Sequence, residues 1–177
     1  SIVDYPDFRN LPGPDMEVFS KAISSGQFPL SVLAMKSHIA ENFQTGIYGN
    51  TMTGNPKALE IGCDTLRRLN SDITKNISEK GLAFKHMLES VQQKYPEIAT
   101  HVTGTGLLVA LHIDEKIPVV GEKGLEYLCR KNGLNVIHGG KNALRFTPYF
   151  LITDEEIELV EKILCDTFSE KKSQKLD

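Results

Sequence analysis

The first residue that could do chemistry is Lys21, which stands among small and apolar residues in the segment Phe19-Ser20-Lys21-Ala22-Ile23-Ser24-Ser25-Gly26. Burial lowers the pKa of a lysine, and a neutral amine can form a Schiff base with a carbonyl compound. The same pattern also suits an exposed lysine whose alkyl stem covers apolar neighbours. This segment by itself leaves both interpretations open.

A second feature is the loop over residues 48–56, with the sequence Tyr-Gly-Asn-Thr-Met-Thr-Gly-Asn-Pro. Thr51 and Thr53 supply hydroxyl groups, and Asn55-Pro56 has the form of a helix N-cap followed by a proline at the first helical position. Unpaired amides and the helix dipole favour anions at such a place, so the loop could bind a phosphate. The alternative is a glycine-rich loop with an ordinary capping asparagine.

A third feature is Arg145, which lies between apolar residues in Leu144-Arg145-Phe146-Thr147-Pro148. Arginine is rarely buried without a partner. Its planar guanidinium can hold a carboxylate through two parallel hydrogen bonds. The alternative is an arginine on an edge strand that pairs with a surface acid such as Glu155.

The elements that must position Lys21 and Thr51 are short. Three prolines predict an irregular segment over 1–15, because proline fixes φ and removes a donor. The apolar run 30–35 predicts a buried strand, and 38–43 predicts one or two helical turns. Three glycines predict a loop over 44–54, after which a helix is expected to begin at Asn55-Pro56.

The pattern around Arg145 indicates a small α+β layer domain, with helices on one face of a sheet. A helix is predicted over Ser71–Tyr95, stopped by Pro96, and β structure over 101–113. A second helix is predicted over 119–132, ended by Gly133, with short strands at 134–137 and 143–147. The capping box Thr153-Asp-Glu-Glu156 predicts a final helix, and the tail 170–177 is expected to fray.

The composition bounds the function classes. The chain has 177 residues, 40% hydrophobic and 24% charged, which argues against disorder. A net charge of −3 predicts no attraction to nucleic acid or to an anionic membrane, and no run approaches the ~20 apolar residues of a membrane span. The scattered Cys63, Cys129 and Cys165 favour a reduced, cytoplasmic chain. The five histidines lack zinc-ligand spacing, so no metal site is expected.

Taken in chain order, the lysine, the anion-binding loop and the arginine resemble the C-terminal half of the class III, fold-type I, pyridoxal-phosphate-dependent aminotransferases, which include the acetylornithine, ornithine and 4-aminobutyrate enzymes. The resemblance covers nearly the whole chain. The matching stretches are Pro14-Asp-Met-Glu-Val-Phe-Ser-Lys-Ala22, Gly26-Gln-Phe-Pro-Leu-Ser31, Thr51-Met-Thr-Gly-Asn-Pro56, Gly104-Thr-Gly-Leu107 and Leu144-Arg-Phe-Thr-Pro148.

This resemblance implies a role for each residue. Lys21 matches the lysine that forms the Schiff base with the cofactor and then moves the substrate proton. Thr51 matches a threonine that one subunit offers to the cofactor phosphate of its neighbour, which implies a homodimer. Arg145 matches the arginine that binds the carboxylate of an amino or keto acid. Ser25, Gln27 and Thr53 stand where glycine or an apolar residue is common in the family.

The resemblance also implies an α/β architecture, in which residues 1–70 end the large cofactor-binding domain and residues 71–177 form the small C-terminal domain. An N-terminal half would supply a second phosphate loop, an aromatic stacking on the ring and the aspartate that pairs with the ring nitrogen. The chain alone is therefore expected to be inactive. Two alternatives stay open: other chemistry on the same cofactor (aminomutase, racemase or decarboxylase), or a non-catalytic fragment that serves in packing or oligomerisation.

Overall fold

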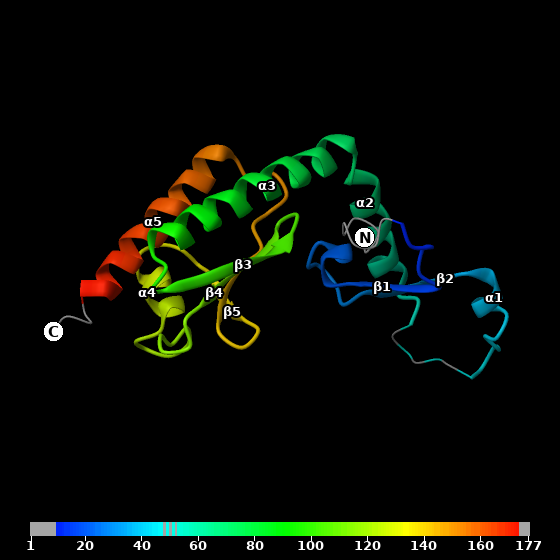
Figure 1. Ribbon diagram of the computed structural model, residues 1–177. Helices are drawn as coiled ribbons and strands as arrows, with labels where there is room; N and C mark the ends of the chain where they lie inside the picture. The colour runs from blue at the N-terminus through cyan, green and yellow to red at the C-terminus, as the bar shows by residue number, and fades with distance from the viewer. Residues whose placement is uncertain (1–9, 48, 50, 52, 174–177) are drawn as a thin grey trace. The chain divides into compact units, whose positions relative to one another are not determined.

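The computed structural model describes residues 10–47, 49, 51 and 53–173 (Figure 1). The chain divides between Asn70 and Ser71 into two compact units. Each unit has its own secondary structure and its own packing, so each is described by itself.

The first unit is built on a β-hairpin and one long helix. Strand β1 (Met16–Ser20) pairs antiparallel with β2 (Ser31–Met35), and the 3₁₀ turn η3 (Lys21–Ser24) follows β1 directly. A short helix α1 (Ser37–Ala40) comes after β2, and α2 (Pro56–Arg68) packs against η3. Helix α2 begins where the sequence predicts, because Asn55 accepts hydrogen bonds from the amides of Lys57 and Ala58.

The strand over 30–35 is confirmed as β2, but the prediction that it is buried is wrong. Leu33 is 47% exposed and Val18, on the paired strand, is 68% exposed. The sheet has only two strands in the described part of the chain. A two-stranded hairpin can bury an apolar face only against another layer, so its alternate apolar side chains face outward here. Strand β1 itself carries no clear period of two and was not expected from the sequence.

The second unit is a four-stranded antiparallel sheet packed with helices. The strand order is β3-β4-β6-β5, formed by β3 (Ala99–Thr105), β4 (Leu108–Ile113), β5 (Ile137–Gly139) and β6 (Ala143–Phe146). Helix α3 (Ser71–Lys94) lies along β3 and β4, and α5 (Asp154–Ser173) packs against α3 (Figure 1). The short helix α4 (Leu125–Lys131) packs against α5.

One continuous hydrophobic core holds the second unit together. It joins the apolar stripe of α3 to the inward side chains of β4 and β6 and to α5, and its largest fully buried members include Phe84, Leu88, Leu111, Leu144 and Phe168. The Phe84 and Phe146 rings lie 5.5 Å apart at 55°, a tilted contact that aromatic rings favour. The predicted helix over 71–95 is therefore confirmed with its apolar face.

Two predicted boundaries in this unit are wrong. The helix expected over 119–132 is only α4, because Gly121 has a φ of +97° and the helix is entered at Gly124 from an extended backbone. The tail expected to fray from residue 170 remains helical to Ser173. It is held by an ion pair between Lys172 and Glu97 and by the Lys171 ammonium donating to the Lys123 carbonyl.

The other local predictions vary in accuracy. The capping box is confirmed, since Glu156 N donates to Thr153 Oγ1 and Thr153 N donates to Glu156 Oε2. The predicted β region over 101–113 is a hairpin. The strand expected at 134–137 is displaced to β5, whereas β6 lies within the predicted 143–147. Residues 1–9 and 174–177 lie outside the described residues.

Candidate functional site

Lys21 is the first residue after β1 and has an unusual backbone. Its φ is +57°, in the left-handed region that side chains disfavour by about 1–2 kcal/mol. Ser20 before it is extended, so the chain turns sharply at Lys21 to enter η3. The Lys21 side chain is exposed and makes no ion pair with any described residue. A strained, unpaired lysine at a sharp turn is a typical feature of a functional position.

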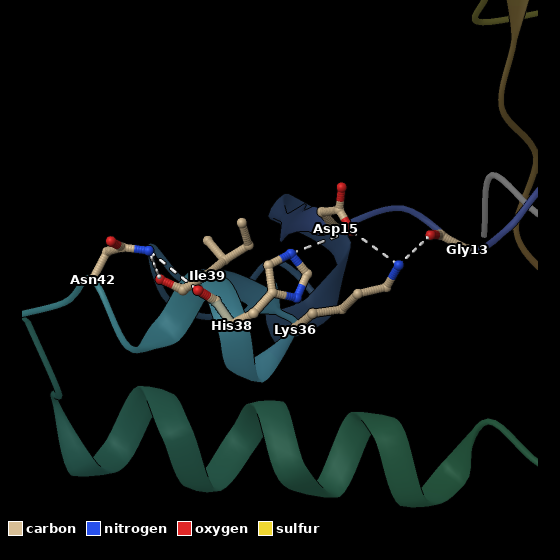
Figure 2. A network of polar contacts seen from close by, with 6 residues as sticks. All are labelled: Gly13, Asp15, Lys36, His38, Ile39 and Asn42. Carbon is tan, nitrogen blue, oxygen red and sulfur yellow. Dashed lines mark hydrogen bonds and ion pairs between the residues drawn. The ribbon is translucent and has the colours of Figure 1, made fainter.

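The hairpin that carries Lys21 is fastened at both ends. At the Lys21 end, Ser20 pairs with Ser31 in the β1–β2 ladder. At the open end, the Lys36 ammonium donates to an Asp15 carboxylate oxygen and to the Gly13 carbonyl, both at 2.9 Å (Figure 2). This hydrogen bond from Lys36 holds the pKa of Asp15 below its ordinary value. Lys21 therefore follows a hairpin whose strand pairing is fixed at both of its ends.

Around that open end, Figure 2 shows a wider polar network. His38 Nε2 lies 3.9 Å from the Asp15 carboxylate, and the Asn42 side-chain amide donates to the His38 and Ile39 carbonyls. All these groups are exposed, so each contact contributes little free energy. Their number nevertheless fixes the path of the chain as it leaves β2 and enters α1.

Thr51 lies in a turn in the loop before α2, and its side chain is exposed. The capping interpretation of this loop is confirmed, because Asn55 Oδ1 lies 3.0 Å from Lys57 N and 3.2 Å from Ala58 N. These two amides are therefore already used and do not face an anion. Among the described residues, the Thr51 hydroxyl has no hydrogen-bond partner. Residues 48, 50 and 52 of the loop lie outside the described residues.

Arg145 lies in β6, which is an inner strand of the sheet. It pairs with Ala110 of β4 on one side and with Ile137 of β5 on the other. The edge-strand alternative is therefore wrong, and Arg145 forms no ion pair with Glu155 or with any other described residue. Its side chain is exposed on one face of the sheet, because the alternate residues Leu144 and Phe146 are buried on the other.

The neighbouring strand leaves room for this arginine. A Cβ added to Gly139 would lie 3.1 Å from Arg145 Cβ, which is tighter than ordinary packing. The Gly139-Gly140 turn thus keeps the stem of Arg145 uncrowded. A guanidinium in this setting is exposed and unpaired, and it can bind a carboxylate through two hydrogen bonds.

Lys21 and Thr51 belong to the first unit, and Arg145 belongs to the second. Within the first unit, no hydrogen bond or ion pair joins Lys21 to Thr51 among the residues that the structure describes. The three side chains supply an amine, a hydroxyl and a guanidinium. The Lys21 amine can add to an aldehyde and the Thr51 hydroxyl can donate to a phosphate, so the residues of the first unit fit a phosphorylated aldehyde cofactor. In the second unit, the Arg145 guanidinium fits a carboxylate.

Three groups of residues close to these positions carry no signal in the sequence. Ser24 is buried in the turn that carries Lys21. The rings of His101 and His112 stack at 4.0 Å on β3 and β4, and burial followed by the His101 charge lowers the pKa of His112. Glu126 of α4 accepts from both the backbone and Nδ1 of His138. Each contact depends on strand register or on loop closure, which local patterns do not specify.

The cysteines, histidines and acidic residues of the described part of the chain form neither a disulfide nor a metal-binding cluster. Cys63, Cys129 and Cys165 are all free thiols. Among the described residues, no group of three His, Cys, Asp or Glu side chains is arranged to hold a metal ion. The lack of a metal remains a prediction. No helix in the described part of the chain is long and apolar enough to cross a bilayer.

Comparison with known proteins defines the class. The profile of the family described as aminotransferase class-III matches residues 11–168. The chain therefore belongs to the class-III aminotransferases, whose members use pyridoxal phosphate, and its fold is the α/β fold of the fold-type I enzymes. The resemblance inferred from the motifs is confirmed.

Three individual members of the family show which enzymes this chain is similar to. The mitochondrial acetylornithine aminotransferase of Neurospora crassa is 33% identical over 157 residues, which are 88% of this chain and 32% of that protein. The acetylornithine aminotransferase of Elizabethkingia anophelis superposes with a TM-score of 0.76 at 26% identity, over 90% of this chain and 42% of that one. The ornithine aminotransferase of Plasmodium yoelii superposes with a TM-score of 0.82 at 25% identity, over 93% of this chain and 43% of that one. The chain thus spans between 32% and 43% of the length of these relatives.

Proposed function

We propose that this chain is part of a pyridoxal-phosphate-dependent aminotransferase, with Lys21 as the lysine that binds the cofactor. The observation that carries the proposal is the unpaired Lys21 amine on a strained turn, within the region matched by the class-III profile. In this proposal, residues up to 70 end the large cofactor-binding domain and the following residues form the small domain. The names of the relatives support an amine of the ornithine or acetylornithine type as donor, and a keto acid is the proposed acceptor.

The three site residues then have separate tasks. When bound, pyridoxal phosphate supplies an aldehyde that condenses with amines and a ring that withdraws electrons. The Lys21 amine would hold the aldehyde carbon and, when free, would act as the base that takes the proton from the α or ω carbon of the substrate. The Thr51 hydroxyl donates to the phosphate of the neighbouring subunit, so the active assembly is a homodimer. Arg145 fixes the substrate carboxylate and thereby orients the carbon that exchanges its amine.

The proposed compartment is the cytoplasm, on the ground that all three cysteines are free thiols. The names of some relatives place them in mitochondria. Cell fractionation with antibody detection of the chain decides between the two compartments.

The direct experiment is a titration of the purified chain with pyridoxal phosphate, followed by borohydride reduction and peptide mass mapping. One adduct per chain at Lys21 supports the proposal. The matched control is Lys131, an exposed lysine of α4, and the variant Lys21→Arg keeps the charge while it removes the reactive amine. Labels spread evenly over the lysines, or an adduct that survives in Lys21→Arg, contradict the assignment of Lys21.

A non-catalytic role in packing or oligomerisation is the second candidate, and one observation favours it. The first unit exposes the apolar side chains of its hairpin, whereas the second unit has a continuous core. Limited proteolysis separates the candidates. Rapid cleavage before residue 70 in the presence of saturating cofactor, with the remainder resistant, supports a packing module. Protection of the first unit by the cofactor supports the enzymatic role.

A further inference from the structure

Ser24 is one of two fully buried polar residues among the described residues, and it ends the turn that Lys21 begins. Its Oγ lies 2.5 Å from the Phe28 carbonyl oxygen and 3.1 Å from the Lys21 carbonyl oxygen. A hydroxyl has a single hydrogen, so Ser24 shares it between these two acceptors. One buried hydroxyl therefore ties the backbone of Lys21 to the end of the loop that follows it.

Ser25 fastens the same turn to α2. Its Oγ lies 2.9 Å from Thr65 Oγ1, and Thr65 Oγ1 donates to the Ile61 carbonyl at 2.9 Å. Since the Thr65 hydrogen is used in that second bond, Ser25 is the donor in the first. The residue also has a left-handed backbone, with a φ of +51°. A chain of hydroxyls thus links the turn to a helix that is capped at its start.

The backbone of Lys21 needs such restraints. At a φ of +57° a residue with a side chain gains by relaxing toward extended or right-handed backbone. Such a relaxation rotates the Cα–Cβ bond and swings the whole lysine side chain in a different direction. The Ser20–Ser31 pair in the β-ladder holds the turn on the upstream side. Ser24 and the Ser25–Thr65 pair are the restraints on the downstream side.

We propose that Ser24, Ser25 and Thr65 are positioning residues for Lys21. The buried Ser24 hydroxyl and the Ser25–Thr65 hydrogen bond hold the left-handed backbone from which the Lys21 amine reaches the cofactor aldehyde. The inference rests on the proposed function of Lys21. None of the three touches the reacting atoms, so their contribution is the direction of the lysine side chain. Loss of either restraint should lower the reactivity of Lys21 while the fold of the second unit stays intact.

The test compares three substitutions in the full chain with one control. Ser24→Ala and Thr65→Val each remove a hydroxyl, and Thr65→Ser restores the hydroxyl at the same place. The control is Ser78→Ala, because Ser78 Oγ donates to a backbone carbonyl of α3 in the second unit. Thr65 lies partly at the surface, so Thr65→Val remains informative if Ser24→Ala fails to fold. Circular dichroism confirms that each variant is folded before it is compared.

Two measurements are made on each variant. The first is hydrogen exchange at the amides of Ser25 and Gln27, which donate to the Ala22 and Ser24 carbonyls. The second is the rate of borohydride-trapped pyridoxal phosphate labelling at Lys21, relative to Lys131 in the same molecule. Loss of one restraint should speed exchange about tenfold and lower the labelling ratio about fivefold, as expected for a single hydrogen bond. Thr65→Ser and Ser78→Ala should stay within about twofold of the unaltered chain.

The possible failures are distinguishable. If the unaltered chain labels Lys21 no faster than Lys131, the proposed function of Lys21 fails before any variant is considered. If the unaltered chain prefers Lys21 and the variants exchange faster but keep that preference, the hydroxyls are merely structural and the positioning proposal is overturned. The same conclusion follows if Thr65→Ser behaves like Thr65→Val. Loss of the preference in both hydroxyl deletions, with rescue by Thr65→Ser, supports the proposal.

Discussion

Gly81 of α3 lies directly against Gly106 in the turn between β3 and β4. A Cβ added to Gly81 would lie 2.6 Å from both the carbonyl carbon and the carbonyl oxygen of Gly106, which is a backbone collision. Gly106 itself has a φ of +52°. The second glycine of the Gly104-Thr-Gly106-Leu107 motif is therefore explained by a turn that needs left-handed backbone and by close approach to a helix.

This contact predicts the effect of Gly81→Ala. The methyl group cannot be accommodated without moving α3 or the hairpin turn, so the substitution should lower the free energy of unfolding of the second unit by about 2 kcal/mol. Urea unfolding followed by circular dichroism measures the loss. Ser78→Ala, at an exposed position of the same helix, should change stability by less than about 0.5 kcal/mol. Equal stability of the two variants would show that the helix can shift freely.

Glu126 should make the second unit sensitive to acid. Its carboxylate accepts from His138 Nδ1 at 2.9 Å and from Arg130 at 2.9 Å, and these hydrogen bonds, chiefly that of His138, hold the pKa of Glu126 below its ordinary value of 4.5. Since the folded pKa is the lower one, the contribution is complete above pH 4.5 and is lost as the pH falls through the folded pKa.

The variant Glu126→Gln keeps the size of the side chain and removes its charge. It should lower stability at pH 7 by roughly 1 kcal/mol, and this loss should shrink as the pH falls through the folded pKa of Glu126, because the native carboxyl then becomes protonated. Urea unfolding at several pH values gives both numbers. Glu89, an acid of α3, provides the matched control as Glu89→Gln. A loss that does not shrink as the pH is lowered would exclude the charge as its cause.

The three thiols should react in a fixed order. Cys63 is exposed, Cys165 is partly exposed and Cys129 is fully buried. Burial raises the pKa of the Cys129 thiol to about 12, so its reactive thiolate is nearly absent at pH 8. Alkylation with iodoacetamide and peptide mapping should modify Cys63 first, then Cys165, and Cys129 only after denaturation. Early modification of Cys129 would indicate that the core of the second unit opens readily.

Arg145→Lys should separate binding from stability. The Arg145 side chain is exposed and makes no ion pair within the described residues, so the free energy of unfolding should change by less than about 0.5 kcal/mol. A lysine cannot reproduce the two parallel hydrogen bonds of an arginine with a carboxylate. In an active preparation of the enzyme, the KM for the keto acid should therefore rise about tenfold or more. Arg67→Lys, on an exposed face of α2, is the control. An unchanged KM would remove Arg145 from the substrate site.

Local signals predicted the ends of several helices correctly. Asn55 and Pro56 start α2, and Thr153 with Glu156 starts α5, because a cap is made between residues at most four apart. The start of the helix predicted over 119–132 was wrong, because it is decided by packing and not by a local cap. Its apolar spacing is helical only in part, and Gly121 and Gly124 take loop conformations that follow from packing.

For the candidate site, the order of the motifs was sufficient to indicate the family and to select Lys21, Thr51 and Arg145. The resemblance of the motifs to the family gave that selection, whereas each segment by itself left a structural alternative open. The roles of the three residues remain predictions. The surroundings of the three residues could not be predicted. The edge-strand alternative for Arg145 was wrong because the pairing of β6 with both β4 and β5 is not encoded in the local sequence.

Caps, turn residues, helical periodicity and the family itself thus follow from the linear order of this sequence. The left-handed backbone at Lys21, the burial of Ser24 and the inner position of Arg145 do not. The inner position of Arg145 depends on strands that are distant along the chain, and the Ser25–Thr65 hydrogen bond joins residues that are 40 apart. Such contacts form only when the strands register and the helices pack, because short-range preferences of about 1 kcal/mol are overridden by the larger free energy of burial.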